Sequence, residues 1–592
     1  MKLFTPLVLF AAALLRDVSA GHNHHTGLHE YEKVLGGVSD AGSRNKVKRV
    51  AIIGAGSAGT STSYHLRRYA LAAGIPLNIT IFERSPYIGG RSTTVNAYNL
   101  TNPPLSAILE LGGSIFVSVN HILKNATRDF NLSTSTISPP STTAPKIGIY
   151  NGETFVFTGG SIWDIAKLWW RYGLAPYRAN NLMKETVGRF LEMYDQRRGG
   201  FPFVSLGGAV VERGLSGVVA ATGEQYLREN GVGDLFAREV VTASTRVNYA
   251  QHLPLIHGLE TMVCMATSGA MSIAGGNYQI FQSMALNSTS DIRLSTTVTS
   301  LTKQEDSATY ILKSTSSTPY SGGDTIETTT TSTFDTVILA APYQYADLKV
   351  TPQSPYKPDE IPYVTLHVTL FTSPHLLDPV AFGLKVGEKV PQVVLTTLLP
   401  DEHPGIKPIF PGKVGFYSIS TLHTVTNPST GREEFAYKIF TPHPVIFSFL
   451  AKILGVNSTT LISSTPSSSS SSSSTPSEED SPPQDFTSKD ISWIYQKIWQ
   501  SYPYEYPRVT FEELRLDENF WYTAGIESFI STMETSALMG MNVARLVVDE
   551  WVSGRRHEYF EESLGRKTRA PLTAVVEDEE EVVEEESLNV EL

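Results

Sequence analysis

Three glycines near the N-terminus have the spacing of a dinucleotide-binding turn. Gly54, Gly56 and Gly59 follow the apolar segment 47–53 and open a segment of helical pattern that runs to about residue 73. A strand, a glycine turn and a helix in this order let the backbone approach a pyrophosphate closely and seat the helix on the sheet. We therefore expect a nucleotide cofactor here, although this pattern alone does not say which one.

An acid and a second pair of glycines follow at the next apolar strand. Glu83 ends that strand 24 residues after Gly59, where a carboxylate accepts hydrogen bonds from the ribose hydroxyls of an adenosine. Gly89 and Gly90 precede Arg91, which places flexible backbone and a guanidinium beside the same phosphates. A nicotinamide site does not need this second phosphate clamp. The combined string resembles the FAD-binding signature of amine oxidases and related flavoproteins.

Two distant segments complete a cofactor site of this type. Residues 110–114, with the sequence ELGGS, are similar to the glycine turn that passes the flavin in such enzymes. Residues 524–527 and the helix expected from residue 533 are similar to their last flavin-binding stretch, where helix N–H groups point at the flavin. The residues that we assign to the cofactor are Gly54, Gly56, Ser57, Ala58, Gly59, Glu83, Arg84, Gly89, Gly90, Arg91, Gly112, Gly113, Ser114, Val298, Gly525, Glu527, Met533 and Glu534.

Four further segments narrow the resemblance. Residues 245–251 (TRVNYAQ), 275–277 (GGN), 366–369 (LHVT) and 525–542 together resemble the prenylcysteine oxidase family, also called prenylcysteine lyase. The resemblance implies that FAD is the cofactor and that the enzyme oxidises the thioether of farnesyl or geranylgeranyl cysteine with molecular oxygen. The products would be free cysteine, an isoprenoid aldehyde and hydrogen peroxide, formed during the degradation of prenylated proteins.

A substrate of this kind needs an anchor for its amino acid end and a long apolar pocket. We assign Arg246, Tyr249 and His367 to the substrate, with Arg246 as the partner of its carboxylate; the other interpretation of Arg246 is a hydrogen-bond network in the core. The reaction requires an aligned pose more than a strong base, so no catalytic residue is assigned. Candidate pocket walls are Trp163, Trp169, Trp170, Tyr172 and residues 262–271, although core packing is the favoured interpretation of each one taken alone.

Two other functions stay open at this point. A flavin amine or polyamine oxidase shares the cofactor scaffold, and a secreted lipid-binding protein could retain FAD without catalysis. A metal is not expected, because no carboxylate or cysteine clearly supports the histidines of the N-terminal leader, His22, His24, His25 and His29.

The elements that must position these residues follow from the apolar patterns. Strands are expected at 77–82, 293–303, 309–313 and 336–340, a half-buried antiparallel strand at 363–371, and helices at 162–172, 182–194 and about 533–552. We therefore predict an α/β protein in which a Rossmann-type FAD-binding domain with a parallel sheet is interleaved with an α+β substrate domain. The FAD-binding domain takes residues 47–135, 270–345 and 515–553, and the prenylcysteine-lyase-type substrate domain takes residues 145–265 and 350–514.

Composition and charge describe the rest of the chain. The 592 residues carry a net charge of −12, and the nine acids of 577–591 contribute most of it, so no nucleic-acid partner is indicated. We expect a signal peptide at 1–20, a flexible leader at 21–46, a disordered serine-rich insertion at 459–484 and an acidic tail at 554–592.

These features predict the secretory pathway, with the lysosome, the vacuole or the medium as destination. No segment after the signal peptide is apolar enough to span a bilayer, so we expect at most peripheral membrane contact with the lipophilic substrate. A single cysteine, Cys264, excludes an intramolecular disulfide. Asn78 is expected to stay bare because it starts a buried strand, and glycosylation is expected at Asn99, Asn125, Asn131, Asn287 and Asn457.

Overall fold

The structure, a computed structural model, describes residues 46–135, 144–159, 162–319, 325–405, 407–456 and 489–554. The expected signal peptide, the leader up to residue 45, the serine-rich insertion, Asn457 and the tail beyond residue 554 lie outside the described residues. The elements below belong to the compact unit of residues 1–548, except that the last helix continues to residue 553.

A six-stranded sheet, mostly parallel, forms the centre of one half of the fold and draws its strands from residues 48–82, 291–339 and 515–522. Its order is β20-β21-β13-β1-β2-β9, and β1 pairs in parallel with both β2 and β13. Residues 50–53 of β1 are buried, as expected for a strand covered on both faces. The predicted α/β fold with a Rossmann-like sheet is thus confirmed. The strands are β1 (Lys48–Ile53), β2 (Leu77–Phe82), β9 (Asp291–Arg293), β13 (Thr336–Leu339), β20 (Arg515–Asp517) and β21 (Phe520–Tyr522).

One expectation about this sheet is wrong. The side chain of Asn78 is exposed on β2, because successive side chains of the strand alternate between buried and exposed positions at its start. Burial therefore gives no reason for this sequon to stay bare.

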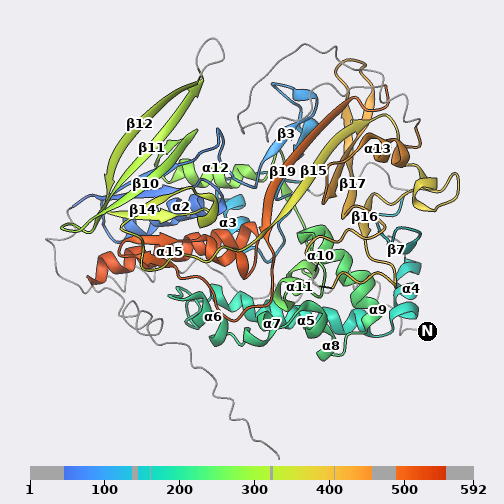
Figure 1. The fold of residues 1–592 in the computed structure, drawn as a ribbon, viewed down its shortest axis with the longest axis horizontal. Coiled ribbons are helices and arrows are strands. Elements are labelled where there is room, and N and C mark those ends of the chain that lie inside the picture. Colours follow the sequence, from blue (N-terminus) through green and yellow to red (C-terminus); the bar gives the residue numbers. More distant parts are fainter. Residues whose placement is uncertain are drawn as a thin grey trace, which may run out of the picture. The chain divides into compact units, whose positions relative to one another are not determined.

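Two helices of this half meet through residues with small side chains. Helix α2 (Ser57–Ala72) follows β1, and α15 (Met533–Ser553) packs against it (Figure 1). The hydroxyl of Ser61 donates to the carbonyl of Ala537 at 2.6 Å. A Cβ atom added at Gly540 would overlap the carbonyl oxygen of Ala58 and lie 2.9 Å from Oγ1 of Thr62. The backbones of the two helices are therefore as close as a glycine allows.

A four-stranded sheet extends from this half in the order β12-β11-β10-β14. Its strands are β10 (Thr296–Gln304), β11 (Thr309–Pro319), β12 (Thr325–Phe334) and β14 (Lys349–Thr351). Strand β11 is longer than the expected 309–313, because its serines and threonines face a threonine-rich partner in β12. β-Branched threonines favour strands, and cross-strand hydroxyls such as Ser314 and Thr330 lie 3.0 Å apart.

The second half is built on a seven-stranded sheet in the order β19-β15-β18-β17-β16-β6-β7. All its neighbours are antiparallel except β16 and β6, and β15 pairs with both β18 and β19. The strands are β6 (Ile147–Tyr150), β7 (Phe155–Gly159), β15 (Tyr363–Ser373), β16 (Val393–Thr396), β17 (Ser418–Thr426), β18 (Glu433–Thr441) and β19 (Trp493–Pro503).

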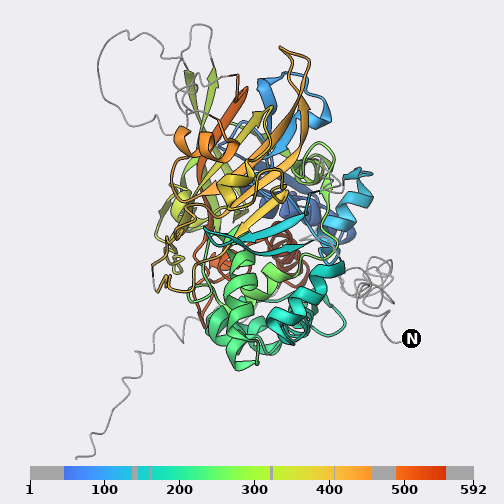
Figure 2. The same ribbon diagram turned by 90° about the vertical axis from the view of Figure 1, so that its right-hand side faces the viewer.

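Helices gather on one side of the seven-stranded sheet in both views (Figures 1 and 2). They are α4 (Ile162–Tyr172), α5 (Ala175–Leu191), α6 (Leu206–Glu212), α7 (Ser216–Ala220), α8 (Gly223–Glu229), α9 (Asp234–Phe236), α10 (Thr242–Tyr249) and α11 (Gly258–Met265). Their shared core includes Tyr172, Val187 and Met262. Among the described residues, no helix combines the length and apolarity that crossing a bilayer requires.

The remaining elements are short and connect these layers. They are β3 (Thr94–Asn96), β4 (Ile108–Glu110), α3 (His121–Asp129), β5 (Thr134–Ser135), β8 (Ser272–Ile273), α12 (Tyr278–Asn287) and α13 (Phe447–Leu454).

The contact between α2 and α15 supplies a first prediction. The change Gly540→Ala should lower the free energy of unfolding by about 1–3 kcal/mol, because the added methyl group has no space against the backbone of α2. The matched control is Gly188→Ala in α5, where a Cβ atom would meet nothing within 4 Å and helix propensity should rise. Thermal unfolding followed by circular dichroism measures both; equal midpoints would contradict the close packing.

Candidate functional site

The two glycine turns, at residues 54–59 and 89–91, contact each other. The N–H of Gly89 donates to the carbonyl of Ala55 at 2.9 Å, and Gly56 and Gly89 form a parallel bridge. A Cβ atom at Gly90 would lie 3.2 Å from Cα of Gly56. The structure therefore brings the second glycine pair to the N-terminus of α2, directly beside the first.

The glycines of the first turn have different neighbours. A Cβ atom at Gly54 would lie 2.8 Å from the carbonyl oxygen of Ala340, and one at Gly59 would overlap the carbonyl oxygen of Gly54. A Cβ atom at Gly56 would meet nothing closer than Cα of Gly90 at 3.9 Å, and its φ of −76° suits any residue. The protein's own atoms thus require glycine at positions 54 and 59, and they leave space next to Gly56.

That space lies at a helix N-terminus suited to an anion. Helix α2 has no acidic residue in its first turn, and its free N–H groups and dipole favour a phosphate. Ser57 and Ala58 are its first two residues. A pyrophosphate fits this arrangement.

Glu83 is held at the end of β2, next to the same turn. Its Oε2 accepts from the N–H of Ala55 at 2.7 Å, and its Oε1 accepts from the N–H of Ser85 at 2.8 Å. Each carboxylate oxygen has a second lone pair, which a ribose hydroxyl can use. Glu83 is therefore positioned for the role expected of it, whereas Arg84 donates to the carbonyl of Tyr345.

The guanidinium of Arg91 corrects an expectation. It was expected beside the phosphates, but it donates to Oε1 of Glu527 at 2.5 Å and to the carbonyl of Ser501 at 2.7 Å. The hydroxyl of Tyr363 donates to the other oxygen of Glu527 at 3.0 Å. The buried carboxylate of Glu527 attracts the cation because no water competes for it. Arg91 therefore links the second glycine turn to the stretch 524–527.

The turn 112–114 meets the start of α15 near these residues. A Cβ atom at Gly113 would lie 2.9 Å from Sδ of Met533, and the hydroxyl of Ser92 contacts the same sulfur at 2.7 Å. A Cβ atom at Gly112 would overlap the carbonyl oxygen of Arg91. Four segments that are far apart in the sequence, 54–59, 89–91, 112–114 and 527–533, thus meet through direct contacts or through α2 and α15.

Glu534 and Val298 have other surroundings than expected. The carboxylate of Glu534 accepts from the N–H groups of Ile122 and Leu123 at 2.9 and 3.0 Å, and from the hydroxyl of Tyr194. It therefore caps α3, and burial raises its pKa to about 7. Val298 is buried in β10 of the four-stranded sheet.

Lys438 is a residue of this region that the sequence did not reveal. Its Nζ donates to the carbonyl of Glu110 at 2.9 Å and to the hydroxyl of Ser114 at 2.8 Å. Burial lowers the pKa of Lys438 to about 8 and raises the pKa of Glu110 to about 7. The one available signal was a lysine inside the apolar run of residues 435–440.

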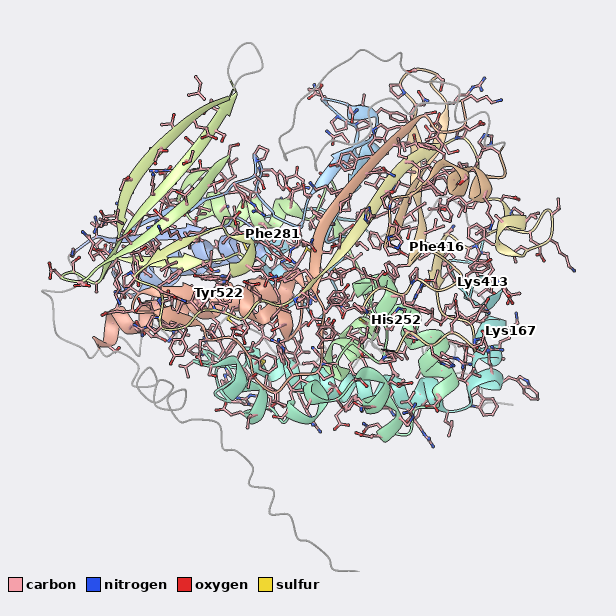
Figure 3. The ribbon with its side chains drawn as sticks, in the orientation of Figure 1. Lys167, His252, Phe281, Lys413, Phe416 and Tyr522 are labelled. Atoms are coloured by element: carbon pink, nitrogen blue, oxygen red, sulfur yellow. The ribbon has the colours of Figure 1, made fainter. Side chains whose placement is uncertain are left out.

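Arg246 corrects the expected carboxylate anchor. It is fully buried in α10 and donates to Oγ1 of Thr396 and to three backbone carbonyls, including that of Phe416 at 3.0 Å. Phe416 lies between the seven-stranded sheet and the helices below it (Figure 3). The guanidinium also packs on the ring of Tyr417. These partners occupy Arg246, so the alternative interpretation, a core network, is the right one.

The other substrate candidates have fewer partners. The hydroxyl of Tyr249 donates to the carbonyl of Ser531 at 3.0 Å, just before α15, and its ring packs on Tyr502. His367 is half-buried on β15, and burial lowers its pKa. Of the three candidates, Tyr249 is the one that contacts the stretch next to the cofactor segments.

The expected walls of an apolar pocket are partly wrong. Trp169 and Trp170 are 62% and 90% exposed, because they lie on the outer face of α4. Tyr172 and Met262 are buried in the helical core. The side chain of Trp163 lies outside the described residues.

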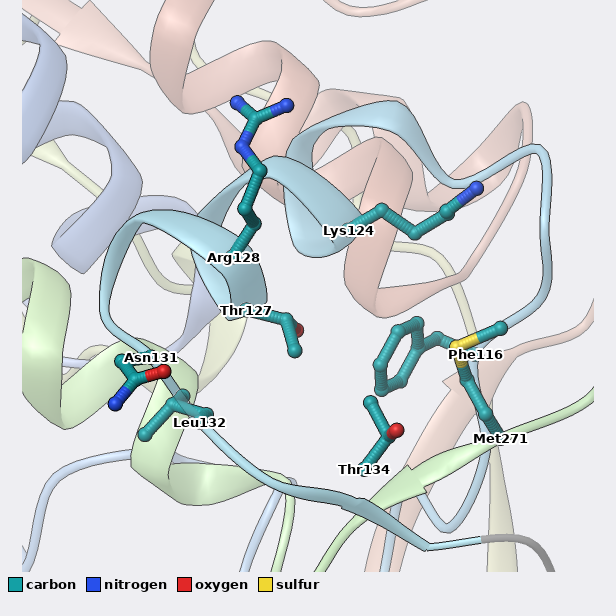
Figure 4. A pocket seen from close by; sticks show the side chains of 8 residues that line it. All are labelled: Phe116, Lys124, Thr127, Arg128, Asn131, Leu132, Thr134 and Met271. Atoms are coloured by element: carbon teal, nitrogen blue, oxygen red, sulfur yellow. The ribbon is translucent and has the colours of Figure 1, made fainter.

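One surface pocket lies beside α3 (Figure 4). Its volume is about 250 Å³, and Met271 lines it together with the cationic residues Lys124 and Arg128. Pockets for drug-sized ligands range over roughly 300–1,000 Å³ and are mostly apolar. This pocket is too small for a chain of fifteen or twenty carbons. Its other lining residues are Phe116, Thr127, Asn131, Leu132 and Thr134.

A buried cluster of His257, Glu260 and Glu505 has the composition of a metal site but not its hydrogen bonding. Its ligand atoms lie within 4.8 Å of one another. Nδ1 of His257 accepts from the N–H of Glu260 at 3.1 Å, so Nε2 carries the proton of the neutral ring. A ligating histidine donates from its second nitrogen instead. The cluster therefore does not fit a metal ion.

The model of the prenylcysteine lyase family matches residues 155–559, which is more than half of the chain. The chain belongs to the prenylcysteine lyase family. The model of an NAD(P)-binding Rossmann-like domain matches residues 52–130, which include both glycine turns and the turn 112–114. The predicted resemblance to this family is thus confirmed.

Relatives of known name span nearly the same length. The chain is 28% identical to a farnesylcysteine lyase of Arabidopsis thaliana over 88% of this chain and 91% of that protein. It is 26% identical to prenylcysteine oxidase 1 of Homo sapiens over 85% and 89% of the two chains. The solved structure of a CLA-producing fatty acid isomerase from P. acnes is similar in fold, with a TM-score of 0.50, 12% identity and coverage of 84% and 98%.

The geometry of this member of the prenylcysteine lyase family fits FAD. The open space at Gly56, the anion-binding end of α2, and Glu83 would hold the adenosine pyrophosphate, and the turn 112–114 with the start of α15 would hold the ring end. FAD is therefore the cofactor that we assign, and the chain is an oxidoreductase.

The different surroundings of Gly56 and Gly59 yield a second prediction. The change Gly56→Val should leave the fold intact and lower bound FAD at least about tenfold, because the side chain fits the protein but enters the space of the pyrophosphate. In contrast, Gly59→Val should reduce stability itself, since it collides with the carbonyl of Gly54. Flavin absorbance per polypeptide and circular dichroism separate the two effects. Stoichiometric FAD in folded Gly56→Val would show that the pyrophosphate lies elsewhere.

Proposed function

We propose that this chain cleaves prenylated cysteine, with a farnesyl or geranylgeranyl group, as an FAD-dependent thioether oxidase. The observation that carries the proposal is the match of residues 155–559 to the prenylcysteine lyase family. Relatives named farnesylcysteine lyase and prenylcysteine oxidase 1, each aligned over most of its length, support the same substrate class.

The reaction balances as an oxidation. Bound FAD supplies the acceptor for a hydride from the carbon between sulfur and the alkene. Water adds to that carbon and the carbon–sulfur bond breaks, which releases cysteine and an isoprenoid aldehyde. Molecular oxygen takes up the two electrons and becomes hydrogen peroxide.

The single thiol of the sequence is unsuited as the nucleophile of a cleavage without oxidation. Cys264, the one cysteine of the sequence, is buried in α11, and burial raises the pKa of its thiol well above the ordinary value. A protonated, enclosed thiol is a poor nucleophile. Attack by Cys264 is therefore not the route of cleavage, which agrees with an oxidative step.

The amine or polyamine oxidase and the lipid-binding protein that retains FAD predict different outcomes when peroxide release is measured. An amine or polyamine oxidase would release peroxide with amines, and a lipid-binding protein that retains FAD would release none. The family match favours thioether oxidation over both.

We also propose passage through the secretory pathway, to the lysosome, the vacuole or the medium, with glycosylation. Supporting features are the apolar N-terminal segment and the exposed sequon asparagines Asn99, Asn125, Asn131 and Asn287.

A patch on α4 and α5 supports peripheral contact with a lipid surface. Trp169 and Trp170 are exposed, and Leu174 and Tyr177 follow at 55% and 52% exposure. Aromatic side chains with basic neighbours are enriched where proteins meet the headgroup region, and Lys167 projects from the same helix (Figure 3). We propose that this aromatic patch gives the enzyme access to a membrane-soluble substrate.

The reaction type is tested in a single anaerobic turnover. Farnesylcysteine should bleach the flavin band at about 450 nm and yield aldehyde and cysteine without oxygen. Deuterium on the carbon bonded to sulfur should slow the bleaching, and the aldehyde should keep one of two labels. A prenyl alcohol with no bleaching would overturn the mechanism. Bleaching by spermine and not by farnesylcysteine would show that the protein acts as an amine oxidase.

The aromatic patch is tested by vesicle flotation. The double change Trp169→Ser and Trp170→Ser should lower binding to phosphatidylcholine–phosphatidylserine vesicles at least about tenfold, because each ring buries apolar area worth about 1.5–3 kcal/mol. The control is Leu71→Ser on α2, which removes a 77% exposed apolar side chain away from the patch. Equal loss in the two proteins, or none in either, would rule out a specific lipid-facing surface.

A further inference from the structure

Lys438 is the one lysine in the buried class among the residues that the structure describes. It lies on β18, between Leu370 of β15 and Ser420 of β17, in the middle of the seven-stranded sheet. An ammonium group loses most of its hydration in such a place, so its N–H groups need hydrogen-bond acceptors within the protein. The position therefore calls for an explanation beyond the sheet.

All hydrogen-bond partners of this ammonium come from one short segment. Nζ of Lys438 donates to the carbonyl of Glu110, to the hydroxyl of Ser114 and, at 3.5 Å, to the carbonyl of Gly112. Ser114 in turn donates to the carbonyl of Gly112 at 2.8 Å. The lysine thus crosses from the seven-stranded sheet to the glycine turn 112–114.

The nearby acid uses its carboxylate elsewhere. Oε1 of Glu110 accepts from the N–H of Asn277 at 2.6 Å, and the amide of Asn277 donates to the carbonyl of Gly113. Lys438 contacts the backbone of Glu110 and not its carboxylate. The positive charge is therefore held by neutral oxygen atoms and directed toward the turn.

The turn itself packs on the start of α15 through Gly113 and Met533. This is the region that holds the ring end of FAD in our assignment. A flavin gains electrons during the reaction, and a fixed cation in a poorly hydrated site stabilises the added negative charge.

We propose that Lys438 is a positioning residue of the flavin site, which fixes the turn 112–114 on the seven-stranded sheet and whose charge favours the reduced cofactor. The proposal rests on the part of the proposed function that assigns FAD, and it does not depend on the identity of the thioether.

The test measures the cofactor rather than turnover. Lys438→Met removes the charge and the donors with a side chain one atom shorter, and Lys438→Gln removes the charge but keeps an N–H donor. At pH 6, below the pKa of Lys438, both should favour oxidised FAD about tenfold more than the unchanged protein, which is about 30 mV for a two-electron couple. Sulfite, which adds a negative charge to the flavin ring, should bind about tenfold more weakly.

Three further variants separate charge from structure. Lys438→Arg should restore the potential. Glu110→Gln, compared with the unchanged protein at pH 8, above the pKa of about 7 of Glu110, should shift the potential in the opposite direction because a nearby negative charge is removed. Lys303 lies on β10 of the four-stranded sheet and forms an ion pair with Asp517 of β20. As a control, Lys303→Met should change neither the flavin potential nor the sulfite affinity. Glu110→Gln gives the sign of the effect even where the neutral Lys438 variants fail to fold.

Two results would overturn the proposal in different ways. An unchanged potential and sulfite affinity in the folded Lys438 variants, or a shift of the same sign in Glu110→Gln, would leave Lys438 with a structural role alone. A purified protein without any flavin would overturn the FAD assignment, and the proposed function with it.

Discussion

Close approach of backbone to backbone is the constraint on which the cofactor half depends. Gly59 lies against the carbonyl of Gly54, Gly90 lies against Cα of Gly56, and Gly540 lies against the carbonyl of Ala58. Each contact removes the room for a side chain. Together they hold β1, α2 and α15 at separations that leave one space open, next to Gly56, at the end of α2 that attracts anions. The cofactor site is thus the space that these backbone contacts leave open.

Two charged side chains connect this half to the seven-stranded sheet. Arg91 reaches Glu527, which also accepts from Tyr363 of β15, and Lys438 of β18 reaches the turn at Ser114. Lys438 and the carboxylate of Glu527 are buried, so each contact is costly to break on one side alone. The seven-stranded sheet and the segments that we assign to FAD are therefore linked by hydrogen bonds from charged side chains.

The distribution of apolar surface fits an enzyme for a lipophilic thioether. The aromatic side chains of α4 lie on the surface, where a lipid can meet them, whereas Arg246 and Cys264 are enclosed among the helices and the sheet. Oxidation at the carbon next to sulfur needs orientation and exclusion of water more than a strong base. Membership of the prenylcysteine lyase family and this arrangement lead to the same chemistry.

The sequence by itself determined the unit β1–α2–β2, because apolar runs, glycine spacing and helical periodicity act between neighbours along the chain, and the family resemblance named FAD. It also predicted strand β15, although residues 368–373 of this strand are all buried and only residues 363–367 alternate. It did not reveal that Glu527 takes the guanidinium of Arg91, that Glu534 caps α3, or that Lys438 holds the turn at Ser114. Each of these pairs joins residues more than 300 positions apart in the sequence. Only tertiary packing decides such partners, because burial removes the water that would otherwise compete for every charge.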